Sequence, residues 1–251
     1  MSARAQGAAL WWITGWAARA ALRERVATLL GVLGLLLVSA TLILRDLEFG
    51  GAEPAFLAET GQGVIFLFGT LFAVLLPSLR WAQDLEARTL LPILARPVCR
   101  ESYFLGQALG LGLVVALFVV GLFGALAVLV WTQEGAGLEA LPGEAARALL
   151  RAWVIVALVL FLGSFLRGAL LTATLGFALV VGGQVMPLVA LSAPTVEGPA
   201  SALLQLVQWL VPNLGAFTSG GPTLVSLLVY GGLYIVAFLG LGAWIFRGRE
   251  V

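Results

Sequence analysis

With 251 residues, 61% of them hydrophobic and 11% charged, and a mean hydropathy of +1.05, the chain is too apolar to be a water-soluble domain. It has no histidine and one cysteine, Cys99, so it lacks the commonest metal ligand and cannot form an intrachain disulfide. Its net charge is +1 and no basic tract points to nucleic acid. We therefore predict an all-α, polytopic membrane protein with a single transmembrane domain over residues 1–251, no metal site and no nucleic-acid partner.

The first apolar stretch, Ala8 to Arg25, mixes tryptophans with arginines. Trp11, Trp12 and Trp16 are of the type that prefers the lipid headgroup region, and the arginines prefer the aqueous side. This pattern predicts an amphipathic helix lying in the membrane interface ahead of the first span. The alternative is that the first span simply begins earlier.

Six later segments are apolar over about the 20 residues that a bilayer crossing needs. The intervals between them contain the charges, glycines and prolines that are typical of connections. The shortest connection, Arg167-Gly168, predicts a very tight turn. The predicted spans are residues 26–44, 61–79, 103–131, 149–166, 169–191 and 223–246.

The 14 basic residues are all arginine, and they are distributed unevenly over the predicted connections. Eleven lie in the N-terminal region, after the second span, after the fourth span or at the C-terminus, whereas the opposite set of regions holds only Arg45, Arg147 and Arg151, the last at the start of the fourth span. Because cytoplasmic connections carry the excess of basic residues, we predict that both termini are cytoplasmic.

The longest charged interval between apolar runs is Arg80 to Gly106. Within it, Asp84 to Ala95 has leucines at roughly helical spacing, which predicts a short amphipathic helix. Pro92 should kink this helix, and Arg96 should end it because the residue before a proline is pushed out of the helical region. The leucines concerned are Leu85, Leu90, Leu91 and Leu94.

The order of residues from Glu86 through Gly110 resembles the first cytoplasmic loop of ABC-2-type transporter permeases, in particular the subgroup named for multi-copper enzyme maturation. In that family the loop carries a coupling helix that sits in a groove of a separate ATPase subunit. An ordinary basic loop that follows the positive-inside rule is the alternative. The matching positions are Glu86, Arg88, Thr89, Leu90, Leu94, Arg96, Pro97, Arg100, Gly106 and Gly110.

The resemblance implies that the helix Asp84 to Ala95 is a partner-binding surface. Leu90 and Leu91 would be its central anchors, and Glu86 and Arg88 would pair with charges at its rim. The residues expected to contact the ATPase are Asp84, Glu86, Arg88, Leu90, Leu91, Leu94 and Arg96.

A second match lies ahead of the last span. The stretch from Trp209 to Phe217, WLVPNLGAF, resembles an L-L-P-N-L-x-x-F element found in many ABC-2 permeases. The overlapping segment Ala200 to Val211 is apolar but too short to cross a bilayer. It predicts an interfacial or re-entrant helix on the outer side.

Ionisable residues are nearly absent from the predicted spans, and none is central in a span. Ion-coupled transporters place such residues near the middle of the bilayer. No nucleotide-binding loop is present either. Gln62, Gln107 and Gln184 are expected to hydrogen-bond between helices, and the pair Gly106 and Gly110 to let helices approach closely.

On these grounds we expect the membrane subunit of an ABC exporter in a bacterial-type inner (cytoplasmic) membrane. The chain itself would not be an enzyme and would hold no cofactor, because ATP and Mg²⁺ would be bound by the partner ATPase. A second permease subunit, identical or different, would complete the transporter, and apolar walls favour a lipid, a lipid-linked group or a hydrophobic peptide as cargo. A structural or assembly subunit without transport activity is the alternative. An intramembrane protease is disfavoured because histidine and paired acids are missing.

Overall fold

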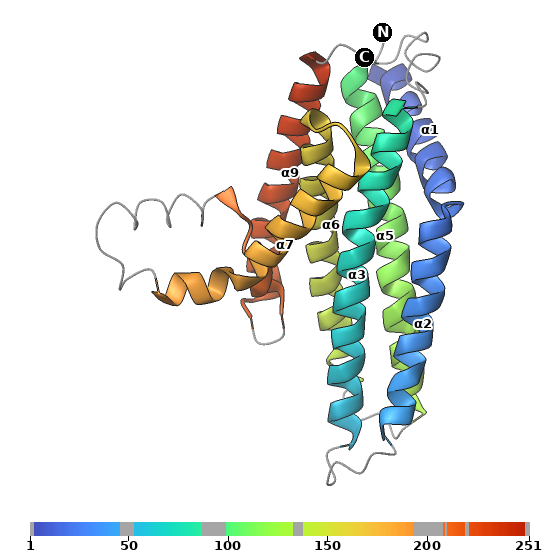
Figure 1. Ribbon diagram of the computed structural model, residues 1–251, viewed down its shortest axis with the longest axis vertical. Helices are drawn as coiled ribbons and strands as arrows, with labels where there is room; N and C mark the ends of the chain where they lie inside the picture. Colours follow the sequence, from blue (N-terminus) through green and yellow to red (C-terminus); the bar gives the residue numbers. More distant parts are fainter. Residues whose placement is uncertain are drawn as a thin grey trace.

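The computed structural model is a bundle of helices packed along one long axis (Figure 1). It describes residues 3–45, 53–86, 99–132, 138–192, 208, 210–218 and 221–248. No strand occurs in these ranges, so the all-α fold class is confirmed for the described chain. The elements are α1 (Ala3–Leu22), α2 (Arg25–Arg45), α3 (Glu53–Glu86), α5 (Arg100–Trp131), α6 (Leu141–Phe165), α7 (Ala169–Ser192), the 3₁₀ helix η2 (Leu214–Phe217) and α9 (Leu224–Gly248).

Within the described ranges, five helices are long and apolar enough to cross a membrane, which indicates a membrane-embedded protein. They coincide with the last five predicted spans. The first predicted span, 26–44, coincides with α2, whose stretch Arg25–Thr41 is apolar but shorter than the other five. The five candidate spans are Ala58–Glu86, Arg100–Trp131, Leu141–Phe165, Ala169–Val189 and Leu224–Gly248.

Two helices extend well beyond the predicted spans, and this changes where charged residues lie. α3 continues to Glu86 instead of ending with its apolar run, and α6 begins at Leu141, ahead of its apolar run. The physical reason is that a helix, once formed, gains a backbone hydrogen bond for each added residue, polar or apolar. Arg80 and Asp84, which the sequence analysis placed after the second span, therefore lie on α3, and Arg151, near the start of the fourth predicted span, lies ten residues after the start of α6.

The longest helices exceed the thickness of a bilayer core. α3 has 34 residues and α5 has 32. At 1.5 Å per residue each is about 50 Å long, whereas the hydrocarbon core is about 30 Å thick. Both helices must therefore extend past the hydrocarbon region, and the last two turns of α3, which carry Arg80 and Asp84, are the charged part of such an extension.

α1 packs lengthwise against the first half of α5, and two glycines of α5 allow the close approach (Figure 1). A Cβ atom on Gly106 would lie 2.7 Å from Cγ2 of Ile13, and one on Gly110 would lie 2.6 Å from Cβ of Ala17. The close approach predicted for this glycine pair is confirmed. α1 thus runs along the bundle, which differs from the course of a helix lying flat in the membrane interface.

A test of this packing is Gly110→Leu. The new side chain would start 2.6 Å from Cβ of Ala17 and 2.7 Å from the backbone oxygen of Thr14, so the two helices would have to separate. We expect a loss of about 3 kcal/mol of stability, the upper range for overpacking. The change is measured as thermal unfolding in uncharged detergent.

The matched control for this prediction is Gly121→Leu on the same helix. Gly121 is exposed and a Cβ atom there meets no atom within 4 Å. Leucine at this position should raise helix stability by about 0.5–1 kcal/mol. Equal unfolding midpoints for the two variants would contradict the role of Gly110 in joining α1 to α5.

An aromatic cluster joins α3, α5, α6 and α9. The indole Nε1 of Trp81 donates to the carbonyl oxygen of Gly163 at 2.8 Å. The Trp81 ring meets Phe104 and Phe246 edge-on, with centroid distances of 5.3 Å and 5.2 Å. All three rings are buried, and edge-to-face pairs are favourable beyond the area that they bury. The cluster therefore holds four helices together within one turn of Arg80.

The tight turn predicted at Arg167-Gly168 is confirmed. α6 ends at Phe165 and α7 begins at Ala169. Gly168 has a φ of +101°, a conformation that glycine adopts at little cost and other residues adopt only under strain. The chain therefore reverses between α6 and α7 within three residues.

The element before the last span packs against a proline in α7, a helix that slants away from the bundle (Figure 1). A Cβ atom on Gly215 in η2 would lie 2.6 Å from Cγ of Pro187. The side chain of Asn213 caps η2, and its backbone N–H donates to the hydroxyl of Tyr230 at 2.8 Å. The helix predicted over 200–211 lies for the most part outside the described residues.

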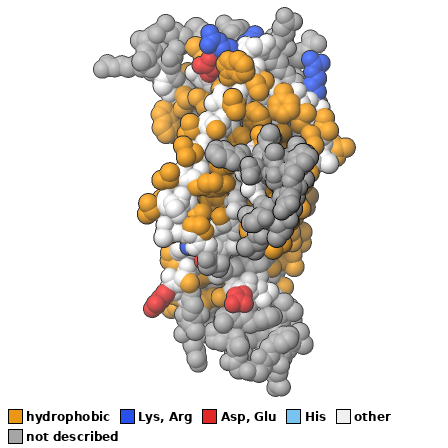
Figure 2. Space-filling model, turned by 90° about the vertical axis from the view of Figure 1, so that its left-hand side faces the viewer, with side chains coloured by type: hydrophobic (Ala, Val, Ile, Leu, Met, Phe, Trp, Pro, Cys, Tyr) orange, Lys and Arg blue, Asp and Glu red, His pale blue; other side chains and the backbone are white. Residues whose placement is uncertain are grey.

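The surface of the described chain is apolar over its middle. Figure 2 shows one face, on which orange apolar side chains cover the middle and charged side chains lie towards the two ends. Leu170 in α7 and Val236 in α9 are 83% and 72% exposed. An apolar middle between charged ends is the surface that a bilayer favours.

Candidate functional site

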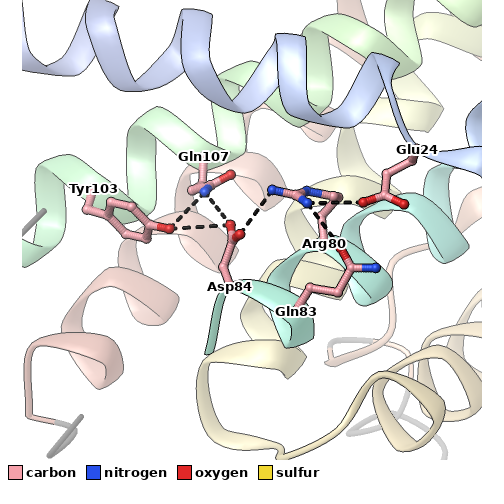
Figure 3. Close-up of polar contacts among 6 residues, drawn as sticks. All are labelled: Glu24, Arg80, Gln83, Asp84, Tyr103 and Gln107. Carbon is pink, nitrogen blue, oxygen red and sulfur yellow. Dashed lines mark hydrogen bonds and ion pairs between the residues drawn. The ribbon is translucent and has the colours of Figure 1, made fainter. Parts of the chain in front are cut away.

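Six polar side chains connect the end of α3 to the start of α5 and to the α1–α2 junction (Figure 3). The first lies between α1 and α2, the next three lie in the last turns of α3, and the last two lie in the first turns of α5. Four-residue spacing places the members of each helix on one face. We call this set the Arg80 network, and its members are Glu24, Arg80, Gln83, Asp84, Tyr103 and Gln107.

Asp84 is the centre of the network and is only 3% exposed. Its Oδ1 lies 3.0 Å from Nη2 of Arg80. Its Oδ2 accepts a hydrogen bond from Nε2 of Gln107 at 2.6 Å and one from the hydroxyl of Tyr103 at 3.3 Å. A buried carboxylate is tolerated only when such donors and a counter-charge surround it. Asp84 therefore ties α3 to α5.

Arg80 extends the network to the N-terminal helices. Its Nη1 donates to Oε1 of Glu24 and to Oε1 of Gln83, each at 3.0 Å. The side chains of Arg80 and Glu24 are 13% and 19% exposed, so their ion pair is better shielded from water than a surface pair. Glu24 lies between the end of α1 and the start of α2, and the pair therefore fixes the α1–α2 junction against α3.

The network lies at the base of the segment 87–98, which itself falls outside the described residues. Asp84 is two residues before the end of α3, and Tyr103 is three residues after the start of α5. The two helices that flank the segment are therefore bonded to each other next to their ends. A force on the segment would act on a linked pair of helices and not on two independent ones.

A weaker contact joins α9 to the same region. Nη1 of Arg247 donates to Oε1 of Glu101 at 3.3 Å. Both side chains are largely exposed, at 73% and 49%, so this pair adds little stability by itself. It nevertheless places the end of α9 beside the start of α5, where the aromatic cluster also binds it.

The structure places the predicted partner-binding residues in two environments. Asp84 is buried in the Arg80 network, a finding that differs from the prediction that it faces a partner, and Glu86 is exposed at the end of α3. The first three residues of the predicted helix Asp84 to Ala95 belong to α3, and the rest of it lies outside the described residues. The other predicted residues, Arg88, Leu90, Leu91, Leu94 and Arg96, lie outside the described residues.

The sequence analysis did not connect Asp84 with its partners. Gln107 was expected to hydrogen-bond between helices, and its bond to Asp84 confirms this. Tyr103 and Glu24 were not considered as members of a site. The four-residue spacing between Tyr103 and Gln107, beside the same spacing between Arg80 and Asp84, is the signal that could have indicated facing polar surfaces.

The chemistry of the network is suited to holding helices together. Its two carboxylates, Glu24 and Asp84, are both paired with Arg80, and the hydroxyl of Tyr103 donates to Asp84. Among the residues that the structure describes, no three histidine, cysteine, aspartate or glutamate side chains gather as a metal-binding group.

No protein-family model matches the chain, and no curated protein matches it at a significant level. The resemblance to ABC-2-type permeases therefore rests on the residues from Glu86 through Gly110 and from Trp209 through Phe217.

Proposed function

We propose that the chain is the membrane-spanning permease subunit of an ABC exporter, driven by a separate ATPase subunit. The observation that carries this proposal is the Arg80 network, which bonds α3 to α5 at the base of the segment 87–98. That segment contains most of the residues that resemble a coupling helix. A coupling helix needs a stiff connection to the spans, and the network is such a connection.

The proposed mechanism is mechanical. Closure of the ATPase on ATP would displace the segment 87–98, and the bonded ends of α3 and α5 would follow together. The aromatic cluster around Trp81 would pass the movement to α6 and α9 through Gly163 and Phe246. Packed and hydrogen-bonded elements move as rigid bodies, so a small shift at the segment becomes a tilt of long helices.

The proposed topology has six spans with both termini in the cytoplasm. The start of α1 and the end of α9 lie at the same end of the bundle (Figure 1), which supports an even number of crossings. α2 added to the five candidate spans gives six. Arg80, Arg100 and Arg247 lie at that end, as expected for the cytoplasmic side.

The partners follow from the same proposal. An ABC ATPase subunit would bind the segment 87–98 and hold ATP and Mg²⁺. A second permease subunit would complete the transporter in a bacterial-type inner membrane, with lipid covering the exposed apolar faces. A non-transporting assembly subunit is the competing function.

The experiment that tests the proposal is purification of the tagged chain from membranes of its own source, followed by quantitative mass spectrometry. We expect an ABC ATPase in near-equal amount to the permease, and ATP hydrolysis by the purified complex. Stable recovery of other membrane proteins without any ABC ATPase would overturn the proposal and favour the assembly subunit.

A further inference from the structure

A cavity of about 490 Å³ lies among α3, α5, α6, α7 and η2, towards the starts of α3 and α6 and thus away from the Arg80 network. A volume of this size is typical of a small-molecule site. Most of its wall is apolar, and the apolar lining includes Ile65, Phe66, Val119, Phe123 and Ile155.

Arg151 of α6 lines this cavity and is only 5% exposed. Its Cζ lies 3.3 Å from the centroid of the Phe66 ring, and its Nη2 donates to Oε1 of Gln184 at 3.2 Å. Its Nε is buried and has no hydrogen-bond partner. Within the described ranges no carboxylate forms an ion pair with Arg151. The nearby Glu144 is paired with Arg147, whose Nε lies 3.9 Å from Oε1 of Glu144.

These contacts do not satisfy all the hydrogen-bond donors and the charge of a buried arginine. A guanidinium has five N–H donors, and the protein contributes an aromatic face and one amide oxygen. A buried charge is stable only when it is paired and its donors are satisfied. Phe66 covers one face of the guanidinium, and Gln184 accepts a hydrogen bond from Nη2, so an oxyanion in the cavity could accept hydrogen bonds from the other N–H groups of the two Nη atoms.

The acidic lining residues narrow the type of anion. Glu59 is exposed, so its negative charge lies nearer to solvent than Arg151 does, whereas the charge of Glu144 is paired with Arg147. This charge repels a free small anion as it enters from water. An oxyanion that is attached to an apolar tail gains the burial of that tail against the cavity wall, which a free anion does not.

We propose that this cavity binds an anionic amphiphile, a phosphate or carboxylate head group joined to an apolar tail. The head would accept hydrogen bonds from Arg151 and from the amide nitrogen of Gln184. The tail would lie against Phe66, Val119 and Ile155. Binding is a property of this chain alone, so the inference goes beyond the proposed function and does not depend on an ATPase partner.

The test uses the full chain in dodecyl maltoside micelles, titrated with dodecyl phosphate and measured by native mass spectrometry. We expect saturable retention of one dodecyl phosphate per chain. Arg151→Gln should weaken its binding at least tenfold, because the head group loses its counter-charge. Arg167→Gln is the control: this exposed arginine lies in the turn between α6 and α7 and does not line the cavity, so its loss should change binding less than twofold.

Two further measurements test whether binding needs the cavity, and whether it needs both the anionic head group and the apolar tail. Gly63→Phe fills the cavity while keeping Arg151, since a Cβ atom on Gly63 meets no atom within 4 Å, and it should weaken binding as much as Arg151→Gln does. Inorganic phosphate and dodecyltrimethylammonium should not be retained. Unchanged binding of dodecyl phosphate to either variant, or equal retention of either control compound, would overturn the proposal. If Arg151→Gln does not fold, Gly63→Phe decides the matter.

Discussion

Replacing Leu90 and Leu91 together with Asp should abolish co-purification of the ATPase while leaving membrane insertion intact. Both leucines are the proposed anchors of the coupling helix, and two carboxylates cannot be buried in an apolar groove. Interface hot spots contribute at least about 2 kcal/mol each, so loss of two corresponds to about a thousandfold weaker affinity. The affinity of purified permease variants for the ATPase, measured in detergent, gives this number directly.

The control for that experiment is Glu86→Ala. Glu86 is exposed at the end of α3, so its charge pair with a partner would be screened by water. We expect it to weaken the association by about 1 kcal/mol or less. If the double Asp variant still bound the same ATPase and transported normally, the coupling-helix assignment would be wrong, and an assembly subunit would be the better interpretation.

Hydropathy was enough to locate the apolar part of the fold. The predicted spans from 61–79 onward coincide with helices that could cross a membrane, and the turn at Arg167-Gly168 lies where it was expected. Both features depend on local properties, namely apolar length and the conformational freedom of Gly168. Local properties are what a single sequence displays.

The environment of Asp84 could not be predicted in the same way. A charged residue beside an apolar run indicates the end of a span, and Asp84 was therefore assigned to a surface helix. It is buried because Tyr103 and Gln107 supply donors from positions 19 and 23 residues later in the chain. The packing of two helices determines which donors lie next to a carboxylate. The spacing of residues within one segment does not reveal that packing.

Arg151 illustrates the same limit. It lies near the start of the predicted span 149–166, so it was counted with the arginines on the side opposite to the termini. It is buried because α6 begins at Leu141 and because Phe66 of α3 and Gln184 of α7 lie against it. The cavity around it is formed by five elements, and its existence follows from tertiary packing alone.

The Arg80 network leads to the second large prediction, Asp84→Ala. Removing this carboxylate leaves the hydroxyl of Tyr103 and one N–H of Gln107 without their acceptor, and leaves Arg80 with Glu24 as its only charged partner among the described residues. Breaking a buried ion pair by deleting one member costs about 3–5 kcal/mol. We therefore expect a large drop in the thermal unfolding midpoint in uncharged detergent.

The control variants show whether this loss comes from the link between α3 and α5. Gln83→Ala removes an exposed partner of Arg80 on the same turn and should cost less than about 1 kcal/mol. Gln107→Ala in the Asp84→Ala background should cost less than it does alone, because both members of the bond are then absent. Additive losses would show that Asp84 and Gln107 act independently.

Asp84→Asn keeps the side-chain size but removes the charge. In a complex with the ATPase, this variant should preserve binding of the ATPase and reduce the amount transported per ATP hydrolysed. The reason is that the weakened network would let α3 and α5 move separately when the ATPase closes.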